Sequence, residues 1–105
     1  MTAFVGSLVG RDIRTLTGRS NRVLAVHGHT ALVATVRSPA GRAVDLRKVQ
    51  AAADQLYERG AVGIDVKVVG YRSAFVGAVL SLLPNTEAEL RPRRIRLQVE
   101  PASTS

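Results

Sequence analysis

Residues 22–60 read RVLAVHGHTALVATVRSPAGRAVDLRKVQAAADQLYERG, and this stretch decides the fold that the sequence predicts. Its first half is rich in Val, Leu, Ala and Thr, and residues 22–27 and 30–37 flank Gly28 as two strands flank a hairpin turn. Ser38-Pro39-Ala40-Gly41 predicts a further turn, because proline suits its second position and glycine closes it. We therefore expect a β-hairpin followed by a tight turn.

The second half of the same stretch predicts a helix from Leu46 to Arg59. Asp45 can cap its free N–H groups, and Gly60 supplies its C-terminal end. The apolar residues recur at helical spacing and form one face. They are Leu46, Val49, Ala53 and Leu56.

The segments on either side extend this pattern. Residues 5–16 carry apolar side chains at helical spacing and predict a helix ended by Gly18, although Gly6 and Gly10 disfavour it. Residues 64–69 alternate as a strand does, and residues 73–83 predict a second core helix with Pro84 just beyond it. Gly77 inside that helix indicates close packing against another element. Residues 95–100 alternate again and predict a last strand.

These elements predict a single α+β domain over residues 1–100, followed by a disordered tail over residues 101–105. The expected architecture is a small antiparallel sheet, made of the hairpin plus one or two further strands, packed against two or three helices. A chain of 105 residues with 46% hydrophobic residues can bury a core of this size without disulfides or metals. The chain has no cysteine, which excludes thiolate chemistry and suits the cytoplasm. The apolar stretch Met1–Gly10 is too short to cross a bilayer, so we expect neither a membrane anchor nor a signal peptide.

Charge is the most informative bulk property of the chain. It has 15 Lys+Arg against 8 Asp+Glu and a formal net charge of +7, which attracts polyanions. All the basic residues except Lys48 and Lys67 are arginines, whose guanidinium groups can bind phosphate through two parallel hydrogen bonds. A GC-rich coding sequence would produce the same preference for arginine. Aromatic residues make up only 4% of the chain, too few for a platform that stacks single-stranded bases, so duplex DNA is the favoured partner.

Three short segments carry candidate nucleic-acid-binding residues, which could hold phosphates or read a base edge. A loop, a turn and a helix start supply them: Arg19, Ser20, Asn21 and Arg22; Arg37 and Arg42; Arg72 and Ser73. Each segment also has a purely structural interpretation. The loop and the turn could be ordinary polar connections, Ser73 could only cap its helix, and Arg72 could pair with Asp65.

Other functions have weaker support in the sequence. His27 and His29 lack a third ligand at zinc-like spacing, so we expect no metal and no cofactor. Asp65 and Lys67 match half of a magnesium nuclease site, whose second acid would have to be Asp45 or Asp54. The apolar run at residues 76–83 favours a protein-interaction or homodimerisation module instead.

Taken together, three stretches resemble a small module attached to bacterial restriction proteins. They are Ile13–Leu16 leading into Gly18–Arg22, then Arg37–Pro39 through Gly41–Val44 with Val49-Gln50, and then Gly70–Leu80 running to Leu83-Pro84. Their sequence is similar to the N-terminal head module of McrA-like HNH endonucleases, which attack modified DNA. The resemblance implies a DNA-binding or positioning role in a restriction defence system, alongside a partner nuclease domain. It also implies that the chain is no enzyme itself, because it has no HNH motif.

Overall fold

The computed structural model of the chain describes residues 1–64 and 73–98. The elements of the described part are, in chain order, α1 (Thr2–Gly6), β1 (Asp12–Arg14), β2 (Ser20–His27), β3 (Thr30–Ala34), β4 (Arg42–Asp45), α2 (Leu46–Arg59), β5 (Ala61–Gly63), α4 (Ser73–Leu80), β6 (Thr86–Leu90) and β7 (Arg93–Leu97). The predicted α+β class is confirmed. The strands, however, form two antiparallel sheets where the sequence analysis expected one: a first sheet in the order β1-β2-β3-β4 and a second in the order β5-β7-β6.

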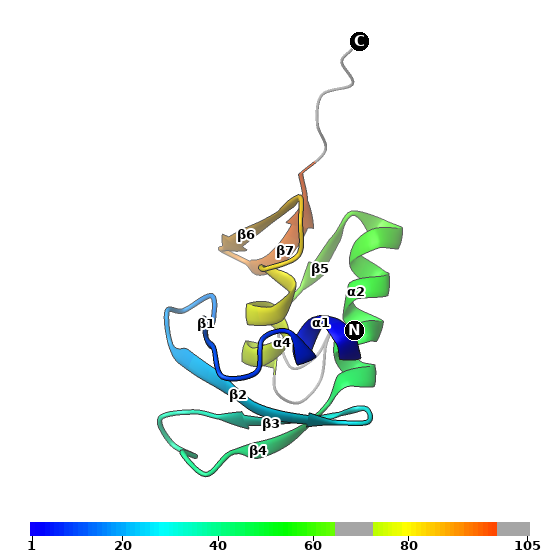
Figure 1. The fold of residues 1–105 in the computed structure, drawn as a ribbon. Coiled ribbons are helices and arrows are strands. Elements are labelled where there is room, and N and C mark those ends of the chain that lie inside the picture. The colour runs from blue at the N-terminus through cyan, green and yellow to red at the C-terminus, as the bar shows by residue number, and fades with distance from the viewer. Residues whose placement is uncertain (65–72, 99–105) are drawn as a thin grey trace.

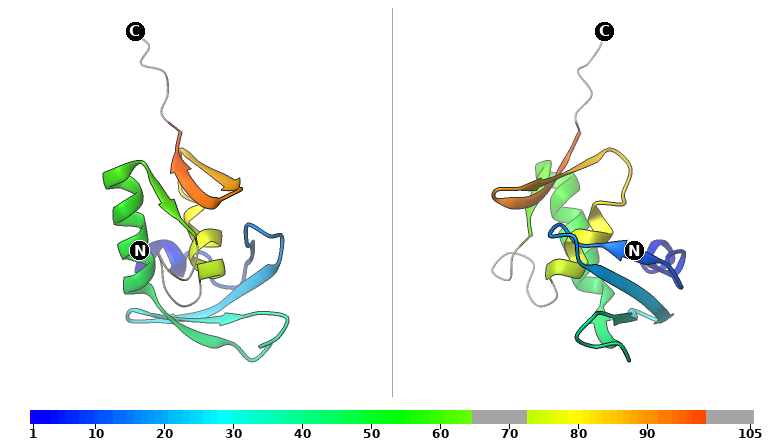
Figure 2. Two further views of the ribbon diagram at one scale, coloured as in Figure 1. Left: turned by 180° about the vertical axis from the view of Figure 1, so that it is seen from behind. Right: turned by 90° about the vertical axis from the view of Figure 1, so that its left-hand side faces the viewer.

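Helix α2 links the last strand of the first sheet to β5 of the second sheet along the chain, and α4 packs between the two sheets. Figure 1 shows the first sheet at one end of the molecule and the second sheet near the other, with α4 between them. Helix α4 contacts β1 of the first sheet, β7 of the second, and α2 beside it. Figure 2 shows the same layering from behind and from the side. The core is continuous across these layers, and its fully buried side chains include Val5, Val23, Leu46, Val49, Leu56, Val62, Val76, Val79, Leu80 and Ile95.

The predicted hairpin and the helix after it are confirmed, although β2 begins two residues before the predicted strand and β3 ends at Ala34 rather than at Arg37. Strands β2 and β3 pair in antiparallel register with His27 opposite Thr30, so that Gly28 and His29 form the turn. Helix α2 has the predicted bounds: the Asp45 carboxylate accepts a hydrogen bond from the Arg47 backbone N–H at 2.9 Å, and Gly60 ends the helix with φ +80°. Glycine suits that left-handed conformation because it has no Cβ to clash with the backbone.

The helix predicted for residues 5–16 is wrong over most of its length. Helix α1 ends at Gly6, and Asp12–Arg14 forms β1, where Ile13 is buried between two exposed charged residues. Gly10 has φ +83° and is incompatible with a continuing helix. Pairing of β1 with β2 satisfies the backbone of this segment and outweighs the helical spacing of its apolar residues.

The C-terminal third follows the prediction in part. Helix α4 begins at Ser73 as predicted but ends at Leu80, three residues early, because the chain turns there and the Thr86 hydroxyl donates to the carbonyl groups of Leu80 and Leu83. Strand β7 covers residues 95–97 of the predicted last strand but begins two residues earlier, at Arg93. Strand β6 was not predicted. The strand expected over residues 64–69 lies outside the described residues except for Ile64, which follows β5. The tail at residues 101–105 also lies outside them.

Gly77 lies close to the side chains that pack against α4. A Cβ at this position would lie 2.8 Å from Cγ2 of Ile64 and 3.5 Å from Cγ of Leu16. The prediction that this glycine serves close packing is confirmed.

Candidate functional site

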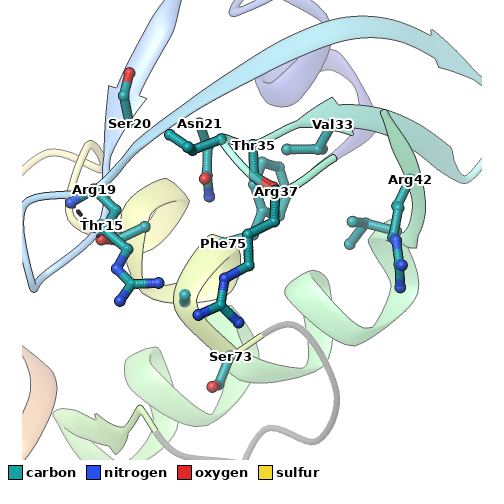
Figure 3. Close-up of a pocket in the computed structure, with 13 residues that line it drawn as sticks. Thr15, Arg19, Ser20, Asn21, Val33, Thr35, Arg37, Arg42, Ser73 and Phe75 are labelled. Carbon is teal, nitrogen blue, oxygen red and sulfur yellow. Dashed lines mark hydrogen bonds between the residues drawn. The ribbon is translucent and has the colours of Figure 1, made fainter. Parts of the chain in front are cut away.

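A pocket of about 330 Å³ opens between the first sheet and the N-terminal end of α4. Its walls come from the β1–β2 turn, from β2, β3 and β4, from the β3–β4 turn and from the first turn of α4 (Figure 3). The residues that line it are Thr15, Arg19, Ser20, Asn21, Val33, Thr35, Val36, Arg37, Arg42, Val44, Ser73, Ala74 and Phe75.

This pocket unites most of the candidate residues that the sequence distributed over three segments. Those that line it are Arg19, Ser20, Asn21, Arg37, Arg42 and Ser73. Ser20 belongs to the wall, but Figure 3 shows its hydroxyl pointing away from the arginine side chains. Arg72 lies outside the described residues.

Arg22 lies elsewhere and has a carboxylate partner. Its Nε donates to Oδ1 of Asp12 at 2.9 Å and its second guanidinium nitrogen donates to Oδ2 at 3.1 Å. The hydrogen bond from Arg22 holds the pKa of the Asp12 carboxyl below its usual value. Because side chains alternate along a strand, Arg22 and Asn21 face opposite sides of β2. This ion pair offsets most of the positive charge that Arg22 would offer a phosphate.

Three arginines surround the pocket and form what we call the arginine rim: Arg19, Arg37 and Arg42. All three are exposed, and within residues 1–64 and 73–98 none of them forms an ion pair with a carboxylate. Figure 3 shows the Arg19 and Arg37 side chains extending in the direction of Ser73, with Arg42 further along the sheet. Three guanidinium groups around one opening give it a positive charge, which attracts anions.

Hydrogen bonds within the β1–β2 turn fix the position of Arg19. The Arg19 backbone N–H donates to Oγ1 of Thr15 at 3.0 Å, and its carbonyl accepts from the Thr15 N–H at 2.9 Å. Gly18, with φ +87°, completes the turn. The backbone of Arg19 is therefore held in place while its guanidinium group stays exposed at the pocket.

The β3–β4 turn fixes the other two arginines. Thr35 and Ser38 exchange two backbone hydrogen bonds, at 3.2 and 3.1 Å, and the Gly41 N–H donates to the Ser38 carbonyl at 2.9 Å. Gly41 has φ +94°, and a Cβ there would lie 2.7 Å from Cγ of Leu32. The predicted turn is thus confirmed, and it places Arg37 and Arg42 at the same pocket.

Apolar side chains and two buried polar residues form the interior of the pocket. Val33, Val44 and Phe75 are at most 5% exposed. Thr15 and Asn21 are the only buried polar or charged residues in the described part of the chain, and both line this pocket. The Thr15 hydroxyl is satisfied by Arg19 and by Thr17. The Asn21 carboxamide, by contrast, has no hydrogen-bond partner among residues 1–64 and 73–98, although Asn21 is only 5% exposed.

Several walls of this pocket were not predicted as part of a site. Val33 fell within a predicted hairpin strand and Phe75 within a predicted core helix, and no function was predicted for Val44, Thr15 or Thr35. Only Thr15 carried a usable signal, because a threonine three residues before Gly18 is typical of a turn closed by side-chain hydrogen bonds. The position of Thr35 depends on tertiary packing of the β3–β4 turn and had no such signal.

The other predicted sites have less support. Among residues 1–64 and 73–98, no three His, Cys, Asp or Glu side chains lie close enough together to hold a metal ion. Asp65 and Lys67 lie outside the described residues. The apolar run that favoured an interaction module is buried from Val76 to Leu80, so most of it belongs to the core of this chain. No helix of the described part is both long and apolar enough to cross a membrane.

A comparison of the chain with family models, curated proteins and solved structures finds no match. A functional proposal therefore depends on the geometry of the pocket, on its charge and on the buried Asn21 carboxamide, which has no hydrogen-bond partner in the described part of the chain.

Proposed function

We propose that this chain is a DNA-binding accessory module that holds duplex phosphates with the arginine rim. The observation that carries the proposal is the convergence of Arg19, Arg37 and Arg42 on one pocket. They come from the β1–β2 turn, the β3–β4 turn and the first residue of β4, and none has a carboxylate partner among residues 1–64 and 73–98. Guanidinium groups match the geometry of phosphate oxygens, and a net charge of +7 brings a polyanion to them. Arg22, a candidate on sequence grounds, has only a minor part in this proposal.

The resemblance to the head modules of McrA-like HNH endonucleases suggests a biological setting. In that setting the chain positions DNA in a restriction system, and a separate nuclease domain cleaves it. The proposal accordingly gives the chain no catalytic residue. Pure protein incubated with plasmid and Mg²⁺ is expected to leave the plasmid intact.

The test is a titration of a labelled duplex at several salt concentrations. Each phosphate neutralised by the protein contributes roughly −0.9 to the slope of log affinity against log salt, because condensed counterions are released. Replacing Arg19, Arg37 and Arg42 together by alanine is expected to weaken binding and to make the slope shallower by about 2 to 3.

Arg59→Ala is the matched control for the rim variants. Arg59 is exposed in the last turn of α2 and does not line the pocket, so its loss removes the same charge at another place. It is expected to change the slope by much less than any one rim variant. Equal slopes for the control and the triple variant would show that the positive charge acts without a site, and would contradict the proposal.

A further inference from the structure

The interior of the pocket is lined by groups that phosphate binding would not use. A phosphate needs positive charge and N–H donors, both of which the arginine rim supplies at the opening. Behind the rim lie the apolar surfaces of Val33, Val44 and Phe75, which would not contribute to an anion site. At about 330 Å³, the volume is at the lower end of the range for small-molecule pockets, roughly 300 to 1,000 Å³. The interior therefore fits a compact group with apolar faces.

Asn21 adds a specific requirement for that group. A buried carboxamide that forms no hydrogen bond costs on the order of the desolvation of both its polar atoms, so such a group is normally satisfied. In the described residues the Asn21 carboxamide has no partner, and Figure 3 shows it directed toward α4 and the pocket interior. A carboxamide offers one acceptor and two donors side by side. Its complement is a flat group with a donor and an acceptor on adjacent atoms of one edge.

A nucleobase combines these properties, with apolar faces and a polar edge. Asn21 cannot reach a base that stays stacked in a duplex, however. Its side chain is 95% buried within the pocket, behind arginines that would already contact the phosphates. From this position Asn21 is poorly placed to read the edge of a base that remains paired. The base would have to leave the stack and enter the pocket.

We propose that the pocket receives one base of the bound duplex, turned out of the stack, with Asn21 bonding its polar edge and the arginine rim holding the flanking phosphates. This inference rests on the proposed DNA-binding function and specifies what the pocket itself binds. Turning a base out costs energy, and the cost is smallest where the base is mispaired. The chain should therefore prefer duplexes that contain a mispaired or unpaired base.

The experiment uses duplexes with a single 2-aminopurine, either matched with thymine or mispaired, and the unaltered protein. Extrusion removes this base from its stacked neighbours, so its fluorescence is expected to rise several-fold on binding. Affinity for the mispaired duplex is expected to exceed that for the matched one by about tenfold or more, because less pairing must be broken.

Two variants test the pocket directly. Asn21→Leu removes the polar edge at similar volume, and Ala74→Trp places a large side chain at the pocket from an exposed position in the first turn of α4. Both are expected to abolish the preference for the mispair and the fluorescence rise. Gln98→Leu and Ala51→Trp are the matched controls, because both positions lie away from this pocket and should change neither signal.

The outcomes separate the two proposals. Steep salt dependence with equal affinity for both duplexes and no fluorescence change would overturn the base pocket and leave phosphate binding standing. Absence of duplex binding at low salt would overturn both. Should Asn21→Leu fail to fold, as circular dichroism would reveal, the unaltered protein and Ala74→Trp still decide the question.

Discussion

Asn21 and Arg22 are neighbours in β2, yet their side chains face opposite sides of the first sheet. Both were candidates for one binding cluster, because polar residues in a five-residue loop have no assigned direction in the sequence. Once Ser20 begins a strand, alternation sends Asn21 into the pocket and Arg22 to the surface beside Asp12. Their roles were therefore decided by where the strand begins, which sequence patterns locate only to within a few residues.

Gly77 provides a prediction at the same scale. Gly77→Ala is expected to lower the free energy of unfolding by about 1 to 2 kcal/mol, because overpacking against Ile64 outweighs the gain of about 1 kcal/mol in helix propensity. Gly6→Ala is the control, since nothing lies within 4 Å of a Cβ at that position. Urea unfolding measures both variants. Equal stability of Gly77→Ala and the unaltered protein would mean that overpacking against Ile64 costs no more than the roughly 1 kcal/mol gained in helix propensity, and would contradict the prediction.

An element whose own sequence carries a cap, an apolar face or a terminal glycine was predicted. Strands that form only by pairing with a neighbouring strand were not. Helix α2 has a capping carboxylate, an apolar face and a terminal glycine, all within its own sequence. Strand β1 has only three residues, and its apolar residue also fits a helical face, so pairing with β2 decided its structure. Strand β6 reads TEAEL, with a single large apolar residue, Leu90, which is exposed. Its partner β7 holds it in place, and no pattern within β6 predicts that.

Strands β6 and β7 are also joined by ion pairs, which makes their pairing sensitive to pH. Arg94 forms a salt bridge with Glu89, and Arg96 contacts Glu87 at 3.1 Å and Glu89 at 3.2 Å. The hydrogen bond from Arg94 lowers the pKa of Glu89 from its usual 4.5. A carboxyl whose pKa is lower in the folded state contributes stability above pH 4.5, and that contribution is lost as the pH falls through the folded value.

Glu89→Gln is therefore expected to reduce the loss of stability between pH 6 and pH 3. Urea unfolding at a series of pH values measures this difference. Glu58→Gln on α2 is the control, because Glu58 has no ion pair within the described residues and its loss should leave the profile nearly unchanged. If the two variants have the same profile, the β6–β7 ion pairs do not contribute to the pH dependence.

At the scale of the whole molecule, carboxylates neutralise part of the positive charge. Several arginines are neutralised beside carboxylates, among them Arg22, Arg47, Arg94 and Arg96. The arginine rim has no such partner in the described residues and surrounds the pocket. Composition predicted an excess of positive charge, and the motifs included all three arginines of the rim. Neither could predict which arginines have carboxylate partners, because that depends on how the strands pair.

This division predicts how DNA changes the stability of the fold. A duplex that binds only the folded state stabilises it by RT ln(1 + [DNA]/Kd), about 2.7 kcal/mol at a hundredfold excess over Kd. The midpoint of thermal unfolding is therefore expected to rise by several degrees in low salt, and the rise should vanish as salt weakens the phosphate contacts. The triple variant lacking Arg19, Arg37 and Arg42 should show little of this rise, whereas Arg22→Ala should retain most of it, since Asp12 already engages Arg22. Equal loss in both variants would mean that the ion-paired arginine contacts DNA as readily as the rim does, and the pocket would no longer define the interface.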